Sequence, residues 1–223
     1  MLKYVLIVAG GTGKRMGSEI PKQFLELAGK PVLMHAIERF YRFDSSIRIV
    51  VVLPANQLGN WSDLKGKYSF TIPHTTVAGG LHRFFSVRNG LAAINEDCLV
   101  AVHDGVRPLV SSETIERCFG SAEKYGNGIP VFSPADSLRI VKGEKNMPVS
   151  REHFRLIQTP QVFEINLIKK AYLIDYSPEF TDDATVLERS GQEIHLVEGN
   201  RENIKITNPE DLAVASALFQ FIS

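Results

Sequence analysis

The stretch YVLIVAGGTGKRMGSEIPKQF, residues 4–24, places a glycine-rich loop directly after a strongly apolar run. The run Tyr4–Val8 consists of β-branched and other apolar residues, which is typical of a strand buried on both faces of a sheet. Residues 9–24 then hold four glycines and three cations. Because such a loop brings backbone N–H groups close to a phosphate, the stretch predicts an α/β sheet with a phosphate site after its first strand.

The alternation that begins at this strand continues along the chain. Apolar runs of strand length alternate with patterns of helical period, and this order predicts an α/β fold with a doubly wound, mostly parallel sheet covered on both faces. We expect strands at 4–9, 47–53, 71–77, 99–103 and 128–132, and helices at 31–43, 56–67, 83–95 and 112–125.

The alternation breaks at residues 133–157, SPADSLRIVKGEKNMPVSREHFRLI. Residues 137–142 alternate in polarity, residues 143–146 form a turn signal, and a second extended piece follows, which predicts a β-hairpin that protrudes from the sheet. An exposed hairpin has unpaired edges, and a second copy of the chain would cover them. We therefore expect a single domain, residues 1–223, with a dimerisation arm at about 134–157 and a homodimer as the assembly.

The α/β pattern resumes after the hairpin. A strand is expected at 161–163, helices at 164–174 and 181–190, strands at 193–197 and 203–206, and a last helix at 209–221.

The composition narrows the classes of partner. Lys plus Arg and Asp plus Glu number 25 each in 223 residues, so net charge predicts neither nucleic-acid nor membrane binding. Cys98 and Cys118 fit no metal spacing and lie in apolar stretches, which favours a reducing compartment. The N-terminus runs directly into a strand instead of a signal sequence, so a cytoplasmic protein is expected.

Two common phosphate loops fail here on specific residues. A P-loop, G-x-x-x-x-G-K-[ST], requires a glycine where Val8 stands and a hydroxyl where Arg15 stands. A dinucleotide-binding turn, G-x-G-x-x-G/A, requires a small residue where Met16 stands, and the strand at 47–53 ends without an acidic residue for a ribose. The partner motifs of the protein-kinase loop are absent from the sequence as well.

The remaining prediction is a loop whose amides hold phosphate while Lys14, Arg15 and Lys22 supply positive charge. Pro21 fixes the backbone just ahead of Lys22. The alternative is a tight turn whose cations face solvent, and the number of cations in so short a stretch favours the phosphate site.

Six blocks follow one another along the chain: AGGTGKRM…PKQF, GGLHRFFSVRNGL, HDGVRP, QTPQVF, TDDATVLERSG and VEGNRENIKITNPEDL. In this order they resemble the sugar-phosphate nucleotidylyltransferases and, within them, the 2-C-methyl-D-erythritol 4-phosphate cytidylyltransferase family. The resemblance runs from about Leu6 to Leu212 and implies a Rossmann-like nucleotidylyltransferase fold. It also implies that CTP is joined to methylerythritol phosphate, with release of pyrophosphate and with Mg²⁺ as cofactor.

The chemistry of this reaction suits the residues. The attacking phosphate oxygen is already an anion, so cations and amide donors are needed more than a general base. The resemblance implies that Arg15 and Lys22 stabilise the α-phosphate and the departing pyrophosphate. It further implies that Arg151 and Lys205 position the acceptor phosphate, with Arg151 reaching across the dimer from the predicted hairpin.

The resemblance also implies the binding residues. Asp104 ends a predicted strand, where it would accept a hydrogen bond from a substrate hydroxyl or lie near the metal, and the sequence leaves both roles open. His103, just before it, is expected in the core. Cytosine would be read by Ala9, Gly10, Gly80 and Ser86, with Gly11 and Gly105 also binding substrate. The polyol phosphate would contact Arg107, Thr159 and Thr181, and Asp136 or Ser137 of the partner's hairpin.

The sequence departs from the family's pattern at two positions, and two alternative functions remain. Leu81 stands where the family commonly has an acidic residue, and Ser137 stands where threonine is usual. Ribitol-5-phosphate cytidylyltransferase shares several blocks, and Val106 leans toward it, whereas TDDAT and VEGNRENIKIT lean toward the methylerythritol enzyme. A non-catalytic nucleotide-binding module is the other alternative, and the presence of Arg15 and Lys22 speaks against it.

Overall fold

The structure, a computed structural model, describes residues 1–10 and 20–222, and it contains the sheet that the sequence predicts. Strand β1 (Leu2–Val8) lies in its interior. The strand order is β10-β7-β11-β6-β1-β4-β5, and β12 also pairs with β7. The other strands are β4 (Arg48–Leu53), β5 (Thr75–Ala78), β6 (Cys98–Asp104), β7 (Asn127–Phe132), β10 (Leu156–Ile157), β11 (Gln161–Glu164) and β12 (Leu196–Glu198).

Most of the pairings are parallel. Strand β1 runs parallel to β4 and β6, β4 is parallel to β5, and β7 is parallel to β12. Only β10 and β11 run antiparallel to their neighbours in this sheet. The prediction of a doubly wound, mostly parallel α/β fold is confirmed.

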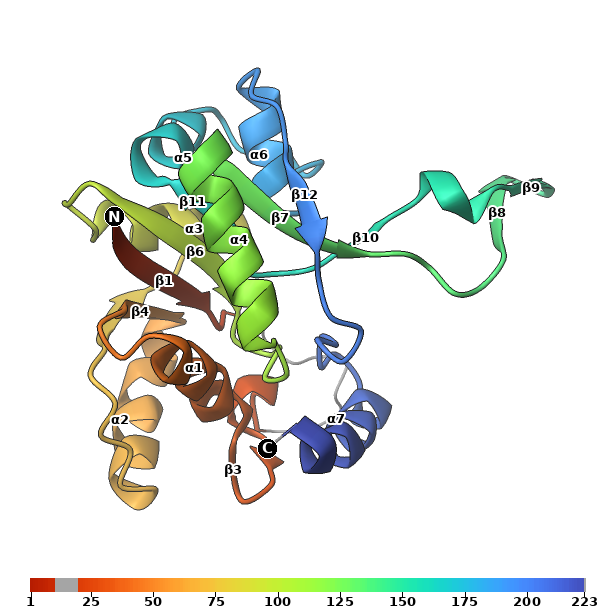
Figure 1. Cartoon of the computed structure of the whole chain (residues 1–223). Helices are drawn as coiled ribbons and strands as arrows, with labels where there is room; N and C mark the ends of the chain where they lie inside the picture. Colours follow the sequence, from red (N-terminus) through yellow and green to blue (C-terminus); the bar gives the residue numbers. More distant parts are fainter. Residues whose placement is uncertain (11–19, 223) are drawn as a thin grey trace.

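Helices cover both faces of the sheet (Figure 1). One face packs against α1 (Val32–Phe43), α2 (Leu58–Lys67) and α4 (Ser112–Tyr125). The opposite face packs against α3 (Arg83–Ala92), α5 (Ile165–Ala171) and α6 (Asp183–Arg189). The last helix, α7 (Pro209–Ile222), packs near a small hairpin of β2 (Glu26–Leu27) and β3 (Lys30–Pro31).

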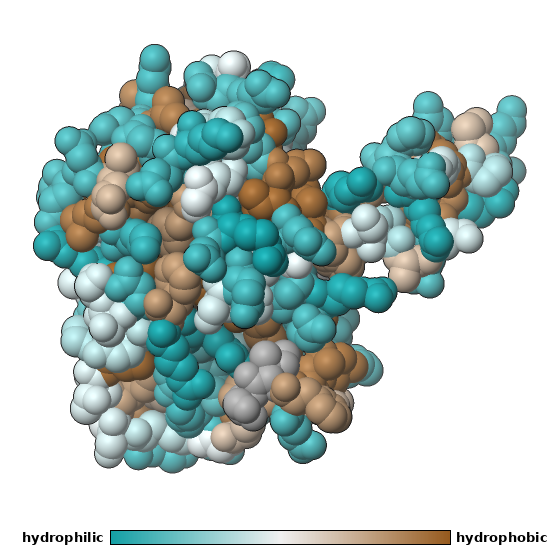
Figure 2. Space-filling view, in the orientation of Figure 1, coloured by the Kyte–Doolittle hydropathy of each residue, from teal (hydrophilic) through white to brown (hydrophobic). Residues whose placement is uncertain are grey.

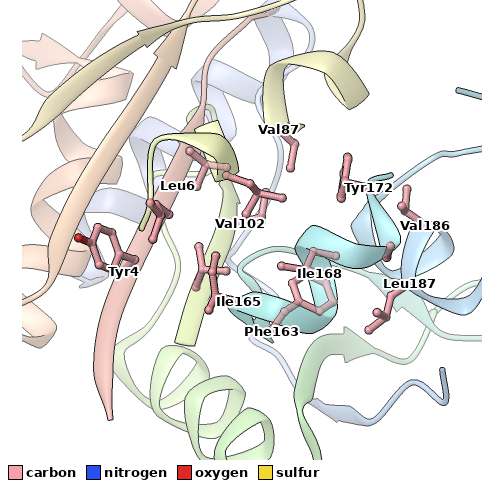
Figure 3. Close-up of a cluster of buried hydrophobic side chains, with 14 of the residues drawn as sticks. Tyr4, Leu6, Val87, Val102, Phe163, Ile165, Ile168, Tyr172, Val186 and Leu187 are labelled. Atoms are coloured by element: carbon pink, nitrogen blue, oxygen red, sulfur yellow. The ribbon is translucent and has the colours of Figure 1, made fainter. Parts of the chain in front are cut away.

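The core under α3, α5 and α6 is shown in Figure 3. Leu6 and Val102 supply the sheet side, and Ile168 and Leu187 supply the helical side, each with an exposed fraction of 0%. Burial of such side chains stabilises a fold by roughly 1.5–3 kcal/mol each, so this layer fixes the helices that carry the site residues.

The predicted hairpin is present as a separate two-stranded sheet. Strands β8 (Leu138–Lys142) and β9 (Lys145–Val149) pair antiparallel around a turn in which Gly143 has φ +60°, a value that favours glycine. The hairpin and the 3-10 turn at Arg151–His153 project away from the body as an arm (Figure 1).

One predicted strand is wrong. Residues 203–206 form no strand, although the amide of Ile206 donates to the carbonyl of Val106 at 2.9 Å. The backbone carbonyl of Asn203 accepts from the side chains of Arg107 and Gln158, at 2.7 and 3.2 Å. The Asn203 carbonyl is therefore satisfied by side chains, and the amides of Asn203, Ile204 and Ile206 bond to single backbone carbonyls in place of a ladder.

Several predicted boundaries shift. Strand β5 begins at Thr75 instead of residue 71, because Pro73 lacks an N–H and the ring of His74 bonds locally, its Nδ1 2.7 Å from the carbonyl oxygen of Ile72. The β2–β3 hairpin was not predicted. Among the described helices, none combines the length and apolar character that crossing a bilayer requires.

Candidate active site

The carboxyl ends of the central parallel strands meet at one edge of the sheet, where open α/β sheets bind their ligands. Strand β1 runs out into Ala9 and Gly10, β5 into Gly80, and β6 ends at Asp104. The register pairs Val8 of β1 with Asp104 of β6, so these strands end side by side. The topology thus brings together four predicted site residues from three distant parts of the sequence.

A cavity of about 200 Å³, cavity A, lies at this edge. It contains most of the residues predicted to read the nucleotide, together with the two predicted catalytic lysines, and Leu81 and His82 stand at its wall. Its lining is Val8, Ala9, Gly10, Lys22, Gln23, Gly80, Leu81, His82, Arg83, Ser86, Asp104, Val106 and Lys205.

Gly80 and Ser86 form a tight corner of cavity A. The hydroxyl of Ser86, in the first turn of α3, accepts from the Gly80 amide at 3.1 Å and donates to the His82 carbonyl at 3.2 Å. A Cβ built on Gly80 would lie 2.4 Å from the Cβ of Phe85, so the chain passes too close for any other residue without a shift. This corner therefore holds the backbone of Gly80 against α3.

A second cavity, of about 210 Å³, lies beside the first and is called cavity B. Three of the residues predicted to contact the polyol phosphate, Arg107, Thr159 and Thr181, gather here with two glutamines and two acidic side chains. Its lining is Arg83, Asp104, Arg107, Ile157, Gln158, Thr159, Gln161, Thr181, Asp182 and Lys205. Arg83, Asp104 and Lys205 line both cavities, so these three side chains form the wall where the two meet.

Three cations surround the carboxylate of Asp104. Lys205 Nζ lies 2.9 Å from Oδ2, Arg107 Nε lies 3.5 Å from the same oxygen, and Arg83 Nε lies 3.5 Å from Oδ1. Burial opposes ionisation of this group, but the charges of Arg83, Lys205 and Arg107 outweigh it and hold the pKa of Asp104 well below its usual range. The wall therefore carries an ionised carboxylate and a net positive charge.

Thr159 and His103 support this wall from beneath. The His103 ring is fully buried, as predicted, with Nε2 3.0 Å from the Arg107 carbonyl and Nδ1 3.2 Å from the Thr159 hydroxyl. Because the carbonyl only accepts, Nε2 carries the proton and the Thr159 hydroxyl donates to Nδ1. That hydroxyl also accepts from the Asp104 amide at 3.1 Å. Burial lowers the pKa of His103 to about 4, which keeps the ring neutral.

The glutamines of the QTPQ block tie separate segments to the site. Gln158 Nε2 donates to the carbonyl of Asn200 at 2.8 Å. Gln161 Oε1 accepts from the amides of Asp183 and Ala184 at 3.1 and 2.9 Å, and its Nε2 donates to Asp182 at 2.8 Å. Gln161 thus fixes the N-terminus of α6, next to Thr181.

The predicted arm residues lie elsewhere. Asp136, Ser137 and Arg151 are exposed and line neither cavity A nor cavity B. Arg151 donates to the Ala135 carbonyl and lines an open cavity of about 810 Å³ between the arm and the body, called cavity C, together with Arg155 and Arg201. The structure of one chain therefore brings together the predicted body residues but not the arm residues.

Gly105 does not line either cavity, but a Cβ on it would meet Ala9 and Leu33 at 3.0 Å, and its amide donates to the Val8 carbonyl at 2.9 Å. Gly11 and Arg15 lie outside the described residues, so their predicted roles stay predictions.

The sequence prediction did not include Arg83 among the site residues. Its guanidinium lines both cavities and contacts two carboxylates, Asp104 and Asp183. The GGLHRFF block contains it, but nothing in the local pattern shows that it faces an aspartate 100 residues away. His82 also lines cavity A, and Leu81 is 87% exposed at its edge.

Comparison with known proteins identifies the family. The model of the family described as 2-C-methyl-D-erythritol 4-phosphate cytidylyltransferase matches residues 3–220. The chain belongs to this family. It is a cytidylyltransferase by that membership, as the sequence blocks indicated.

Sequence relatives and solved structures of this family match the chain over nearly its full length. The chain is 50% identical over 218 residues to the 2-C-methyl-D-erythritol 4-phosphate cytidylyltransferase of Bacteroides thetaiotaomicron, covering 98% of this chain and 100% of that protein. It is 39% identical to the enzyme of that name from Clostridium botulinum, covering 97% and 96%. The crystal structure of the Thermus thermophilus enzyme superposes with a TM-score of 0.81 at 31% identity, covering 99% and 100%.

Proposed function

We propose that this chain transfers the cytidylyl group of CTP to 2-C-methyl-D-erythritol 4-phosphate, forming 4-diphosphocytidyl-2-C-methyl-D-erythritol and pyrophosphate. The observation that carries the proposal is the shared wall of cavities A and B. A nucleotide in cavity A and a phosphorylated alcohol in cavity B have Arg83, Asp104 and Lys205 between them. The α-phosphorus and the attacking oxygen then meet at a cationic wall.

Cavity A suits the nucleotide in this proposal. The corner at Gly80 and Ser86 presents backbone and a hydroxyl to a small base, and Ala9 and Gly10 line the same cavity, with a Cβ on Gly10 expected 3.5 Å from the Ser86 hydroxyl oxygen. Lys22 lines the same cavity, and Arg15 is proposed to join it on the phosphates. Positive charge placed where charge develops on the phosphoryl oxygens lowers the barrier to the transfer.

Cavity B suits the acceptor. Arg107 and Lys205 supply charge for its phosphate, and Thr159 and Thr181 supply hydroxyls for its polyol. The attacking phosphate oxygen forms the new bond to the α-phosphorus while the bond to pyrophosphate breaks, and no proton has to be removed first. Held orientation and charge are therefore the chain's main contributions to the rate.

Mg²⁺ belongs to the proposal as an ion held mainly by the triphosphate and water, which is its usual mode of binding. The described residues include no group of three or more metal-ligating side chains. Both oxygens of Asp104 face cations, which fits a charge-balancing or hydroxyl-accepting carboxylate better than a metal ligand. The ion would neutralise phosphate charge.

The proposed assembly is a homodimer in which the arms are exchanged. Three apolar side chains on β8 and β9 are exposed, Val141 by 68%, Met147 by 60% and Ile140 by 41%. The space-filling view shows hydrophobic surface on the arm and where the arm joins the body (Figure 2). A two-stranded hairpin is only marginally stable in water by itself, so a partner chain gives this arm its support. Arg151, Asp136 and Ser137 would then enter the partner's site.

A cytoplasmic location belongs to the same proposal. Cys98 and Cys118 are both free and buried, which suits a compartment that keeps thiols reduced.

The test is a turnover assay of the purified full chain with CTP and Mg²⁺, offering methylerythritol phosphate and ribitol 5-phosphate separately. We expect faster pyrophosphate release with methylerythritol phosphate. Faster release with ribitol 5-phosphate would replace the acceptor by that alcohol. If Lys22→Ala left CTP-dependent pyrophosphate release unchanged, the catalytic assignment would be wrong. If the wild-type chain released no pyrophosphate with either alcohol, the result would favour the non-catalytic module.

A further inference from the structure

The wall between the two cavities is itself held by a buried clamp behind it. Asp183, with an exposed fraction of 0%, accepts from both terminal nitrogens of Arg83, Nη1 to Oδ1 at 2.8 Å and Nη2 to Oδ2 at 2.7 Å. This is the bidentate pairing that restricts a guanidinium to one orientation. Arg83 therefore has a fixed plane, and its remaining Nε faces Asp104 at 3.5 Å.

Tyr172 and Gln161 fix Asp183 in turn. The Tyr172 hydroxyl, at the end of α5, lies 2.6 Å from Asp183 Oδ1. Burial and the neighbouring Asp183 carboxylate raise the pKa of Tyr172 well above its usual value, so the hydroxyl donates. Gln161 Oε1 accepts from the Asp183 amide at 3.1 Å. Side chain and backbone of Asp183 are thus both held.

The ring of Tyr172 is anchored in the core. It is 2% exposed and stacks on Phe84, with ring centroids 4.7 Å apart. In Figure 3 it lies at the edge of the hydrophobic cluster, between Val87 of α3 and Val186 of α6. The hydroxyl of Tyr172 is therefore a fixed point, positioned by packing that does not depend on the site.

These contacts form one continuous series that ends at a predicted catalytic residue. It runs from the Tyr172 hydroxyl to Asp183, then to Arg83, then to Asp104, and finally to Lys205 Nζ at 2.9 Å from Asp104. We propose that Tyr172 and Asp183 are positioning residues that fix Arg83, and through it Asp104 and Lys205, at the junction of the nucleotide and acceptor cavities. The inference rests on the proposed reaction.

The physical reason lies in the competition of two carboxylates for one guanidinium. While Asp183 holds both Nη atoms, Arg83 presents only Nε to Asp104, and Asp104 Oδ2 is left for Lys205 and Arg107. If the hold of Asp183 weakens, Arg83 turns toward Asp104 and takes up that oxygen. Lys205 then loses its anchor, and the acceptor phosphate loses its orientation.

A merely structural clamp would join α3, α5 and α6 without any effect on the acceptor. Both interpretations expect a loss of stability when the clamp is cut, so stability alone does not distinguish them. Only the positioning role expects the acceptor side of the kinetics to change more than the CTP side, because the series ends at Lys205.

The experiment compares Tyr172→Phe with Tyr4→Phe in the full chain. Tyr4 is a matched control because its hydroxyl also donates to a carboxylate, Glu96, and its ring belongs to the same hydrophobic cluster, but it lies toward the opposite end of β1 from the site. We expect both variants to lower the melting temperature slightly. Tyr172→Phe should raise the KM for methylerythritol phosphate by about tenfold, with the KM for CTP within about twofold, as misplacement of a supporting group does in other sites.

Asp183→Asn provides the second variant. It should lower kcat/KM for methylerythritol phosphate by about a hundredfold, and the Tyr172→Phe result stands by itself if this variant fails to fold. Equal kinetic parameters for Tyr172→Phe and Tyr4→Phe would overturn the inference, and so would equal rises in both KM values. Failure of the wild-type chain to use methylerythritol phosphate would instead overturn the proposed function, so the two failures are distinguishable.

Discussion

The Nζ atom of Lys205 lies 2.9 Å from Oδ2 of Asp104, at the place where the two cavities meet. The lysine side chain is 40% exposed, whereas that of the aspartate is 10% exposed. Arg83 and Arg107 also face this carboxylate. The carboxylate of Asp104 keeps two other cations when Lys205 is removed. Lys205 can therefore be replaced by an uncharged residue without leaving a buried charge unpaired.

Lys205→Met should therefore separate activity from stability. We expect kcat/KM for the acceptor phosphate to fall by about a hundredfold or more, because the cation nearest the junction is lost. Its half-exposed ion pair should contribute no more than about 1 kcal/mol to the free energy of unfolding. Steady-state kinetics and chemical denaturation measure the two effects. The control is Lys3→Met, which removes a comparable ion pair outside the cavities: Lys3 Nζ lies 3.4 Å from Asp44 Oδ2. This variant should change neither kcat/KM nor the free energy of unfolding substantially.

Asp104→Asn, unlike Lys205→Met, should lower stability strongly as well as activity. It leaves Arg83, Arg107 and Lys205 around a neutral group, so we expect a loss of roughly 3–5 kcal/mol of stability together with the activity. A variant as stable as wild type would show that the three cations do not depend on this carboxylate. Thermal unfolding at pH 7 measures the loss.

Gly80→Ala tests the tight corner of cavity A. The added methyl would lie 2.4 Å from the Cβ of Phe85, so the segment must move away from α3 and the amide of residue 80 must leave the Ser86 hydroxyl. We expect a stability loss of about 1–3 kcal/mol from overpacking and a KM for CTP that rises by about tenfold. Calorimetry and initial-rate kinetics measure these effects.

The matched control for Gly80→Ala is Gly120→Ala. A Cβ at Gly120, on the exposed side of α4, would meet nothing within 4 Å. Alanine there should stabilise the helix by about 0.4–1 kcal/mol without altering the kinetics. An unchanged KM for CTP in Gly80→Ala would contradict the proposed corner.

The strands that end at the site could be predicted because each is a short apolar run, and parallel strands in an α/β sheet share a carboxyl edge. That rule alone brings Ala9 and Asp104 together. Lys205 came from a family block, not from periodicity, and its segment proved not to be a strand. Side chains of Arg107 and Gln158 take the place of a ladder there, and no local pattern encodes such contacts.

The clamp behind the site could not be predicted for a related reason. Arg83 and Asp183 lie on different helices and meet only because α3 and α6 pack on the same face of the sheet. The partly buried Arg83 and the fully buried Asp183 each look like surface residues in the sequence, because charged side chains are mostly exposed. Only the packed structure shows that each satisfies the other.

His103 predicts a specific pH dependence of stability. Its pKa is about 4 in the folded chain against 6.5 for an unperturbed histidine, because burial disfavours the charged ring. The unfolded chain therefore binds more protons between these values, and stability is lost as the pH falls from 6.5 toward 4. The loss from this residue should reach about 3 kcal/mol.

Urea unfolding at a series of pH values measures this dependence. His103→Gln should show a shallower decline than wild type over the same window, although it is less stable at pH 7. His153→Gln, on the exposed arm, should reproduce the wild-type slope. If His103→Gln kept the full slope, another group would have to account for the acid sensitivity.

The arm residue Arg151 raises a question of which chain it serves. In one chain it is exposed, it donates to the Ala135 carbonyl, and it lines cavity C instead of cavities A and B. The proposed homodimer gives it a role only if the arm of one chain enters the site of the other. In a twofold dimer, each site would then contain Lys205 of one chain and Arg151 of its partner.

Co-expression of Arg151→Ala and Lys205→Ala chains should therefore restore activity that neither variant has by itself. In a mixed dimer, the Lys205→Ala chain contributes an intact arm to the body of the Arg151→Ala chain, so one of the two sites is complete. Random pairing makes half of the dimers mixed, so activity should return to about a quarter of wild type. Pyrophosphate release by the unseparated mixture measures this, and the mixed dimer isolated by two different tags should have about half of the wild-type activity. If Arg151 served its own chain, every site would lack one of the two cations, and mixing would restore nothing.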